Sequence, residues 1–259
     1  MRPAQYQQDV ATFIFERDAS LIFARPGTGK TLATLLAIKD WISEKVAKRV
    51  LIVAPLRVAK LVWGAENQKW HIGLSMSLVT GEMKPKDRDA AIYSGSDVLV
   101  TNFEMLEKVL ATNHGCDAIV IDEISKLRAS NGAWNKLIRK AKFKLAVGLT
   151  GSPTPNTLLS LHGISRAVGI DVFDKSFDKW KRAYFYPTDY QQYKWAPLPG
   201  AREQLQTLLQ PYTYVLDEGA GLLPPVVRVP VPCTLPPDLR AAYDDMRRTS
   251  ALTRRASGL

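Results

Sequence analysis

Short apolar runs recur along the first 155 residues, and each of them ends in a turn or a polar cluster. They are 20-SLIFA-24, 49-RVLIVAP-55, 97-DVLVTN-102, 117-DAIVIDE-123 and 145-LAVGLTG-151. Near-continuous apolar strands are typical of a parallel sheet that is buried on both faces. Amphipathic stretches at 31–48 and 58–70 predict helices between the strands. The alternation predicts an α/β domain with right-handed crossovers, in which ligands bind beyond the carboxyl ends of the strands.

The pattern changes after Pro155. Helical stretches at 157–168 and 201–212 flank an aromatic and basic segment at 177–195. A proline-rich stretch at 223–237 predicts an extended chain, and 238–259 predicts a helix that runs into a basic tail. We therefore expect a small, mostly helical C-terminal extension of the α/β domain, and divide the chain into three parts: 1–156, 157–225 and 226–259.

Composition and charge exclude some classes of protein. The hydrophobic content is 46% and the charged content 23%, which is ordinary for a globular domain. The chain has no apolar run of membrane-spanning length and no apolar core of a secretion signal near its N-terminus, so we expect a cytoplasmic protein without a membrane partner. Cys116 and Cys233 cannot make a disulfide framework or a zinc site on their own. The formal charge of +10 favours polyanionic partners, although this signal alone is not specific.

The stretch 24-ARPGTGKT-31 has the residues of a nucleotide-phosphate site. Such a site needs backbone N–H groups at a helix N-terminus, a lysine for the outer phosphates and a hydroxyl for Mg²⁺. Gly27 and Gly29 allow a close approach of the backbone, with Thr28 between them. Lys30 supplies the cation and Thr31 the hydroxyl, at the start of a predicted helix.

One position departs from the usual G-x-x-x-x-G-K-[ST] pattern, because Ala24 stands where the first glycine is expected. A small side chain is tolerated there, since the phosphates contact the later part of the loop. The alternative is a glycine-containing turn before an ordinary helix. The order of strand, G-T-G-K-T and helix favours the phosphate site.

Two carboxylates follow the apolar run 118-AIVI-121. Hydrolysis of a triphosphate requires an acid at the metal ion and a base at the attacking water. We expect Asp122 to hold Mg²⁺ through its water shell, and Glu123 to orient and deprotonate the water. The candidate catalytic residues are thus Lys30, Asp122 and Glu123. A solvated acidic end of a strand is the alternative interpretation.

Six strings together resemble the first RecA-like domain of superfamily two helicases and translocases, and most closely the Swi/Snf-like branch found in bacteriophages. In the order that the family has them, they are 3-PAQYQQ-8, 24-ARPGTGKT-31, 53-VAPLRVAKLVW-63, 99-LVTNFEML-106, 121-IDEIS-125 and 149-LTGSPTPN-156. The resemblance covers residues 1–156 and extends more weakly to about 245. It implies a P-loop NTPase with a RecA-like parallel sheet, ATP and Mg²⁺ as cofactors, and the host-cell cytoplasm as location if a phage encodes the chain.

The resemblance also implies roles for residues outside the acid pair. Gln7 fits the adenine-reading glutamine best, and Gln5 is the alternative. The family continues into a second RecA-like lobe with an arginine that reaches the γ-phosphate, so we expect this chain to need that lobe in cis or in trans. Without such an arginine, which is worth about 10³–10⁵ in rate, the isolated chain should turn ATP over slowly. On this interpretation 226–259 is a linker and the start of the second lobe.

Nucleic acid is the partner that the resemblance implies, with double-stranded DNA favoured and no sequence preference. Candidates for the grip on the phosphates and for its coupling to ATP are Arg57, Lys60, Thr101, Asn102, Thr150 and Ser152. Lys60, and likewise Lys126 and Arg128, are equally well explained as solvated charges. Core packing explains Trp63, Trp70 and most aromatic residues of 177–195 better than stacking on bases.

Three functions remain open from the sequence. The favoured one is the ATP-binding lobe of a helicase or double-stranded DNA translocase. A nucleotide-dependent clamp on nucleic acid or protein, without motor activity, is the main alternative. A P-loop kinase or another small-molecule ATPase is the third, and 101-TNFE-104 and 149-LTGSP-153 have no role in such an enzyme.

Overall fold

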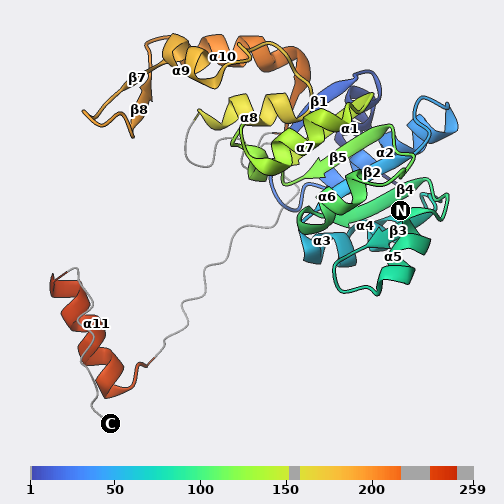
Figure 1. Cartoon of the computed structure of the whole chain (residues 1–259), viewed down its shortest axis with the longest axis horizontal. Coiled ribbons are helices and arrows are strands. Elements are labelled where there is room, and N and C mark those ends of the chain that lie inside the picture. The colour runs from blue at the N-terminus through green and yellow to red at the C-terminus, as the bar shows by residue number, and fades with distance from the viewer. Residues whose placement is uncertain (1, 152–157, 217–233, 250–259) are drawn as a thin grey trace. The chain divides into compact units, whose positions relative to one another are not determined.

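The computed structural model describes residues 2–151, 158–216 and 234–249 (Figure 1). Their contacts form two compact units, Met1–Leu222 and Leu223–Leu259. The second unit contains the helix α11 (Pro237–Thr249), which agrees with the helix expected at the start of 238–259. In the described part of the chain, no helix is both long and apolar enough to cross a membrane.

The first unit is built on a seven-stranded parallel sheet with the strand order β3-β4-β2-β5-β6-β1-β9. The strands are β1 (Ala19–Ala24), β2 (Val50–Ala54), β3 (Met76–Val79), β4 (Val98–Asn102), β5 (Ala118–Asp122), β6 (Leu145–Thr150) and β9 (Thr213–Leu216). All five runs expected to form strands do so, which confirms the predicted parallel α/β sheet. The edge strands β3 and β9 were not predicted.

Successive apolar side chains along each strand point to opposite faces of the sheet, which explains why both faces are covered. In β2, for example, Val50 and Ile52 point into one hydrophobic cluster, whereas Leu51 and Val53 point into the other. Helices flank the sheet on both sides (Figure 1). The first cluster packs under α1 (Gln5–Phe15), α2 (Lys30–Ser43), α3 (Leu56–Leu61) and α4 (Trp63–Lys69).

The second cluster takes its helical residues from the other face of the sheet. The helices are α5 (Pro85–Ile92), α6 (Leu106–Leu110), α7 (Ala133–Ala141), α8 (Ser160–Ala167), α9 (Phe177–Tyr184) and α10 (Ala201–Leu209). Short 3₁₀ turns, η1 (Phe103–Met105), η2 (Ile124–Leu127) and η3 (Gln210–Tyr212), complete the connections. The single helix expected at 58–70 is instead α3 and α4, which meet at Val62.

Within residues 158–216, the described part of the segment 157–225, one strand belongs to the main sheet and two lie outside it. β9 pairs in parallel with β1, so that Leu216 lies opposite Ala24. β7 (Phe185–Pro187) and β8 (Trp195–Pro197) form a separate antiparallel hairpin that projects beyond α9 (Figure 1). The expected division of the chain at residues 156 and 225 stays a prediction, and the pairing of β9 shows that the two sides of residue 156 share one sheet.

Candidate nucleotide and nucleic-acid site

The glycine-rich loop joins the carboxyl end of β1 to the first turn of α2. Gly27 and Gly29 have φ angles of +84° and +78°, in the left-handed region that favours glycine. Gly29 is the N-cap of α2, and a Cβ atom there would overlap the side-chain amide of Gln7. Because α2 begins directly after this turn, its positive N-terminus and free N–H groups face the loop, as an anion site requires.

Helix α1 supports the loop from outside. The Tyr6 hydroxyl donates a hydrogen bond to the Thr28 carbonyl oxygen at 3.0 Å. Gln7 is buried beside the loop, and its Oε1 accepts a hydrogen bond from the Ala4 N–H at 2.9 Å. The Gln5 side chain instead bonds Asp9 on the surface. Of the two glutamines, the structure therefore places Gln7 at the loop, and its role in reading adenine stays a prediction.

Lys30 bends back over the loop that precedes it. Its Nζ donates to the carbonyl oxygens of Ala24 and, at 3.0 Å, of Arg25. Burial lowers the pKa of the Lys30 ammonium, while the charges of Asp122 and Glu123 act to raise it. The lysine and the two carboxylates thus interact electrostatically although about ninety residues separate them in the sequence.

Asp122 is the last residue of β5 and is held by a tryptophan from another element. The Trp63 indole Nε1 donates to Asp122 Oδ2 at 3.2 Å, and Trp63 is fully buried at the start of α4. Burial raises the pKa of the Asp122 carboxyl, and the bond from Trp63 and the charge of Lys30 partly oppose that shift.

Glu123 has an unusual backbone and two hydroxyl partners. Its φ and ψ are +61° and +56°, a left-handed conformation that is uncommon for residues other than glycine and often marks functional sites. Its Oε1 accepts hydrogen bonds from Ser125 Oγ at 2.5 Å and from Thr150 Oγ1 at 2.9 Å. Since Thr150 ends β6, the carboxylate of one strand tip is tied to the hydroxyl of the next.

Oxygen donors at this edge of the sheet suit a hard cation. Asp122 and the Thr31 hydroxyl are the type of ligand that Mg²⁺ accepts, and Thr31 lies in the first turn of α2. Among the residues that the structure describes, no three His, Cys, Asp or Glu side chains form a metal site. A magnesium ion here would therefore need water and nucleotide oxygens as further ligands, as is usual for Mg²⁺.

The candidate nucleic-acid residues divide into exposed and buried ones. Arg57 and Lys60 are exposed on α3, and Lys60 pairs with Glu82 at 2.6 Å. Thr101 and Asn102 are buried at the end of β4. Thr101 Oγ1 donates to the Val79 carbonyl oxygen at 3.0 Å, and Asn102 Nδ2 donates to Glu104. Neither buried side chain joins Arg57 and Lys60 on an exposed surface, and Ser152 lies outside the described residues.

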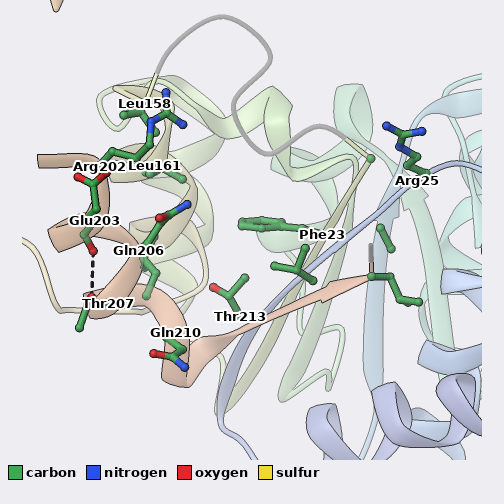
Figure 2. A pocket seen from close by; sticks show the side chains of 15 residues that line it. Phe23, Arg25, Leu158, Leu161, Arg202, Glu203, Gln206, Thr207, Gln210 and Thr213 are labelled. Carbon is green, nitrogen blue, oxygen red and sulfur yellow. Dashed lines mark hydrogen bonds between the residues drawn. The ribbon is translucent and has the colours of Figure 1, made fainter. Parts of the chain in front are cut away.

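A pocket of about 640 Å³ lies beside the loop rather than in it (Figure 2). It includes Ala24, Arg25 and Gly151 beside the glycine-rich loop, and α8, α10 and β9 form its other walls. Figure 2 shows Phe23 and Thr213 on the sheet side, and Arg202, Glu203 and Gln206 on the helical side. Because the pocket includes none of Lys30, Asp122 and Glu123, it is distinct from the candidate nucleotide site.

Sequence reasoning missed several supporting residues. Tyr6, Trp63 and Ser125 each touch a candidate site residue through a hydrogen bond. Trp63 was expected only as a core residue, and its burial confirms that part. Only Ser125 carried a signal close to its partner, since it lies two residues after Glu123 within the motif 121-IDEIS-125.

Comparison with known proteins agrees with the family resemblance of the sequence motifs. The family model described as SNF2-related domain matches residues 6–252. The protein p41 of Acyrthosiphon pisum secondary endosymbiont phage 1 is 26% identical over 268 residues, which cover 95% of this chain and 57% of that protein. The ISWI chromatin-remodeling complex ATPase ISW2 of Saccharomyces cerevisiae is 28% identical over 163 residues, 60% of this chain and 14% of the yeast protein.

Among solved structures, the Sulfolobus solfataricus SWI2/SNF2 ATPase core in complex with dsDNA is similar with a TM-score of 0.69 and 20% identity. The match covers 83% of this chain and 44% of the archaeal chain. The likeness covers most of the chain, which supports the RecA-like fold. The present chain thus spans between about a seventh and little more than half of the length of these relatives.

Proposed function

The chain belongs to the SNF2-related domain family, and from this premise we propose that it is the ATP-binding lobe of a DNA-dependent ATPase of the helicase or double-stranded DNA translocase type. The observation that supports the proposal is the electrostatic interaction of Lys30, in the first turn of α2, with Asp122 and Glu123 at the carboxyl end of β5. In such a protein, ATP hydrolysis would be coupled to movement along nucleic acid.

Each residue at this edge has a defined task in the proposal. The N–H groups after Gly27 hold the phosphates, and Lys30 exchanges two backbone carbonyl oxygens for the β- and γ-phosphate oxygens. Thr31 and Asp122 would hold Mg²⁺, and the ion would neutralise phosphate charge when bound. Glu123 orients the attacking water and accepts its proton.

In this proposal, Thr150 connects ATP hydrolysis with the binding of DNA. Its hydroxyl bonds the Glu123 carboxylate and therefore affects which way that carboxylate can point. A shift of β6 when the lobe binds DNA would change this hydrogen bond. On the DNA side, Arg57 and Lys60 provide phosphate contacts without sequence preference, so binding should weaken as salt rises.

We further propose that a second RecA-like lobe, in cis or in trans, completes the enzyme. An arginine from that lobe would stabilise the charge of the transition state, an effect of about 10³–10⁵ in rate. The chain by itself should accordingly bind ATP but hydrolyse it slowly.

The test is ATP hydrolysis by the protein joined to its second lobe, with and without duplex DNA. We expect DNA to stimulate turnover, and Lys30→Ala and Glu123→Gln to lower the stimulated rate by about 10²–10⁴. Lys39→Ala, exposed on the same helix, and Glu16→Gln, exposed after α1, are matched controls that should keep the rate. Tight binding of DNA with no stimulated turnover would overturn the motor and favour a clamp.

A further inference from the structure

The aromatic and basic segment at 177–195 separates into a buried half and an exposed half. Trp180 and Phe185 are buried and pack against one another, and Trp180 also packs on His162. Tyr190 and Tyr193, which lie between β7 and β8, have relative exposures of 102% and 81%. Core packing therefore explains the first group of aromatic residues and leaves the tyrosines of the hairpin loop without a structural role.

The loop of the hairpin, residues 188–194, is held in place by its own hydrogen bonds. Asp189 Oδ1 accepts from the Lys194 N–H at 2.9 Å, and the Thr188 N–H donates to the Lys194 carbonyl oxygen at 2.9 Å. The Trp195 indole donates to the Gln192 carbonyl oxygen at 2.7 Å. A loop with this many internal bonds can present its side chains with little further loss of conformational entropy on binding.

The base of the hairpin is fixed by a cation. Lys181 Nζ, from α9, lies 4.2 Å from the centroid of the Trp195 ring and 3.7 Å from Asp178 Oδ1. This contact ties the hairpin to α9, whose Lys179 and Arg182 are exposed. Positive charge is thus available on the helix that holds the base of the hairpin, and the exposed Lys194 follows Tyr193 directly in the loop.

The residue composition of the hairpin is typical of a nucleic-acid contact rather than of an apolar protein–protein interface. Residues 185–197 contain no Leu, Ile, Val or Met, whereas the loop offers Gln191, Gln192 and Lys194 as hydrogen-bond donors. The one carboxylate of this stretch, Asp189, already accepts the Lys194 amide proton. Aromatic rings beside cations are the combination that binds single-stranded nucleic acid through base stacking.

We propose that the β7–β8 hairpin is a second nucleic-acid contact of this lobe, which binds single-stranded DNA by stacking bases on Tyr190 and Tyr193. Exposed Lys179, Arg182 and Lys194 attract the phosphates of the same strand. Duplex DNA keeps its bases stacked within the helix and cannot use the tyrosine rings in this way, so the contact distinguishes unpaired from paired strands. The inference extends the proposed function by giving the lobe a site for unpaired nucleotides outside its motor motifs.

The first experiment measures binding of the 259-residue chain to a 5′-fluorescein oligothymidine by fluorescence anisotropy without ATP. The double substitution Tyr190→Ser and Tyr193→Ser should weaken binding about tenfold or more. The double substitution Tyr190→Phe and Tyr193→Phe keeps both rings and should keep the affinity. Tyr93→Ser removes a tyrosine of 60% exposure beside α5 and is the matched control.

The outcomes separate stacking from the alternatives. Unchanged affinity in the serine variant overturns the proposal, and so does an equal loss in the serine and phenylalanine variants, which would indicate bonds from the hydroxyls to phosphates. A loss for duplex DNA that is absent for oligothymidine overturns it as well. Thermal unfolding of each variant confirms that the fold is retained, as expected for exposed side chains.

A second experiment locates the contact directly. Photo-crosslinking to oligothymidine that carries 4-thiothymidine, followed by mass spectrometry, should give adducts within residues 186–194. Adducts there in a protein whose ATPase is not stimulated by DNA would support the hairpin contact while refuting the motor function. Adducts confined to residues 53–63 would leave the motor intact and overturn the hairpin contact.

Discussion

The strands of the main sheet begin along one side, the amino edge, and end along the opposite side, the carboxyl edge. Each of these two edges has a buried or half-buried cation with carboxylates nearby, but the hydrogen-bond partners of these groups differ. At the carboxyl edge, Lys30 donates only to carbonyl oxygens five and six residues before it. At the amino edge, the buried Arg49 donates to the carbonyl oxygens of Ile92 at 2.6 Å and His114 at 2.8 Å, which are 43 and 65 residues away.

The carboxylates at the two edges differ in the donors from which they accept hydrogen bonds. Asp117, at the amino edge, accepts from the backbone N–H groups of Lys48 and Arg49 and so fixes the start of β2 against the start of β5. Asp122 and Glu123, at the carboxyl edge, accept from side chains. A polar group that joins distant backbone segments cannot change partners without unfolding them, whereas one that bonds its own loop or other side chains can. We therefore assign structure to the first edge and ligand binding to the second.

Replacement of Lys30 or Arg49 by methionine should have the largest effects that we expect. Lys30→Met should weaken nucleotide binding and keep stability, whereas Arg49→Met should lower stability and keep nucleotide binding. Lys30→Met should weaken binding of a fluorescent ATP analogue about 100-fold, because a charged hydrogen bond to phosphate contributes roughly 2–3 kcal/mol. Its free energy of unfolding should stay within about 1 kcal/mol, since the lowered pKa of Lys30 shows that burial disfavours its charge.

Arg49→Met should instead lower the free energy of unfolding by about 3 kcal/mol, because several buried acceptors lose their donor. Urea denaturation and nucleotide titration of both variants provide the measurement. Loss of ATP binding in folded Arg49→Met, or a large loss of stability in Lys30→Met, would remove the distinction between the edges.

A smaller effect should follow from Trp63→Phe. The substitution keeps an aromatic ring in the core but removes the N–H donor to Asp122, which is worth about 1 kcal/mol. We expect a roughly fivefold higher Mg²⁺ concentration for half-maximal nucleotide binding. Trp41→Phe is the control, because Trp41 is equally buried and its indole nitrogen has no hydrogen-bond partner among the residues that the structure describes. Equal magnesium requirements in the two variants would show that the indole does not position Asp122.

The last prediction concerns the amino edge alone, and it tests access to solvent rather than binding or stability. Cys116 precedes Asp117 there, and burial raises the pKa of its thiol to about 12 from a reference value of 9.0. In a Cys233→Ser background, the native protein at pH 8 should react with a thiol reagent roughly a thousandfold more slowly than a free cysteine, because so little thiolate is present. Urea should restore the ordinary rate. Fast modification of the folded chain would mean that this edge is open to solvent.

Much of the fold could be predicted because its signals are local. Each of the five inner strands is a short apolar run with a clear end, and the glycine-rich loop is recognisable from eight consecutive residues. β3 was missed because Met76, Ser77 and Leu78 are only partly buried at the sheet edge, which leaves a weak pattern. β9 was missed because its partner, β1, lies almost two hundred residues earlier.

The candidate site likewise has features that local sequence signals predict and features that depend on long-range packing. Residue types and order indicated Lys30, Asp122 and Glu123, whose roles stay predictions. The left-handed backbone of Glu123 and the bond from Trp63 to Asp122 depend on packing between segments that are distant in the sequence. Thr101 and Arg57 were both expected in the grip on nucleic acid, but Thr101 is buried and Arg57 is exposed. Which side chains face outward is decided by the packed fold, and the sequence could not show it here.

The parallel pairing of β9 with β1 has a mechanical consequence. Leu216 lies opposite Ala24, so the chain leaves β9 at the edge where the glycine-rich loop begins. Tension applied along the strand after Leu216 would act on all the β1–β9 hydrogen bonds at once, in shear, instead of opening them one by one. A pull on the end of β9 would therefore reach β1, the strand that leads into the loop of Lys30, through hydrogen bonds that must break together.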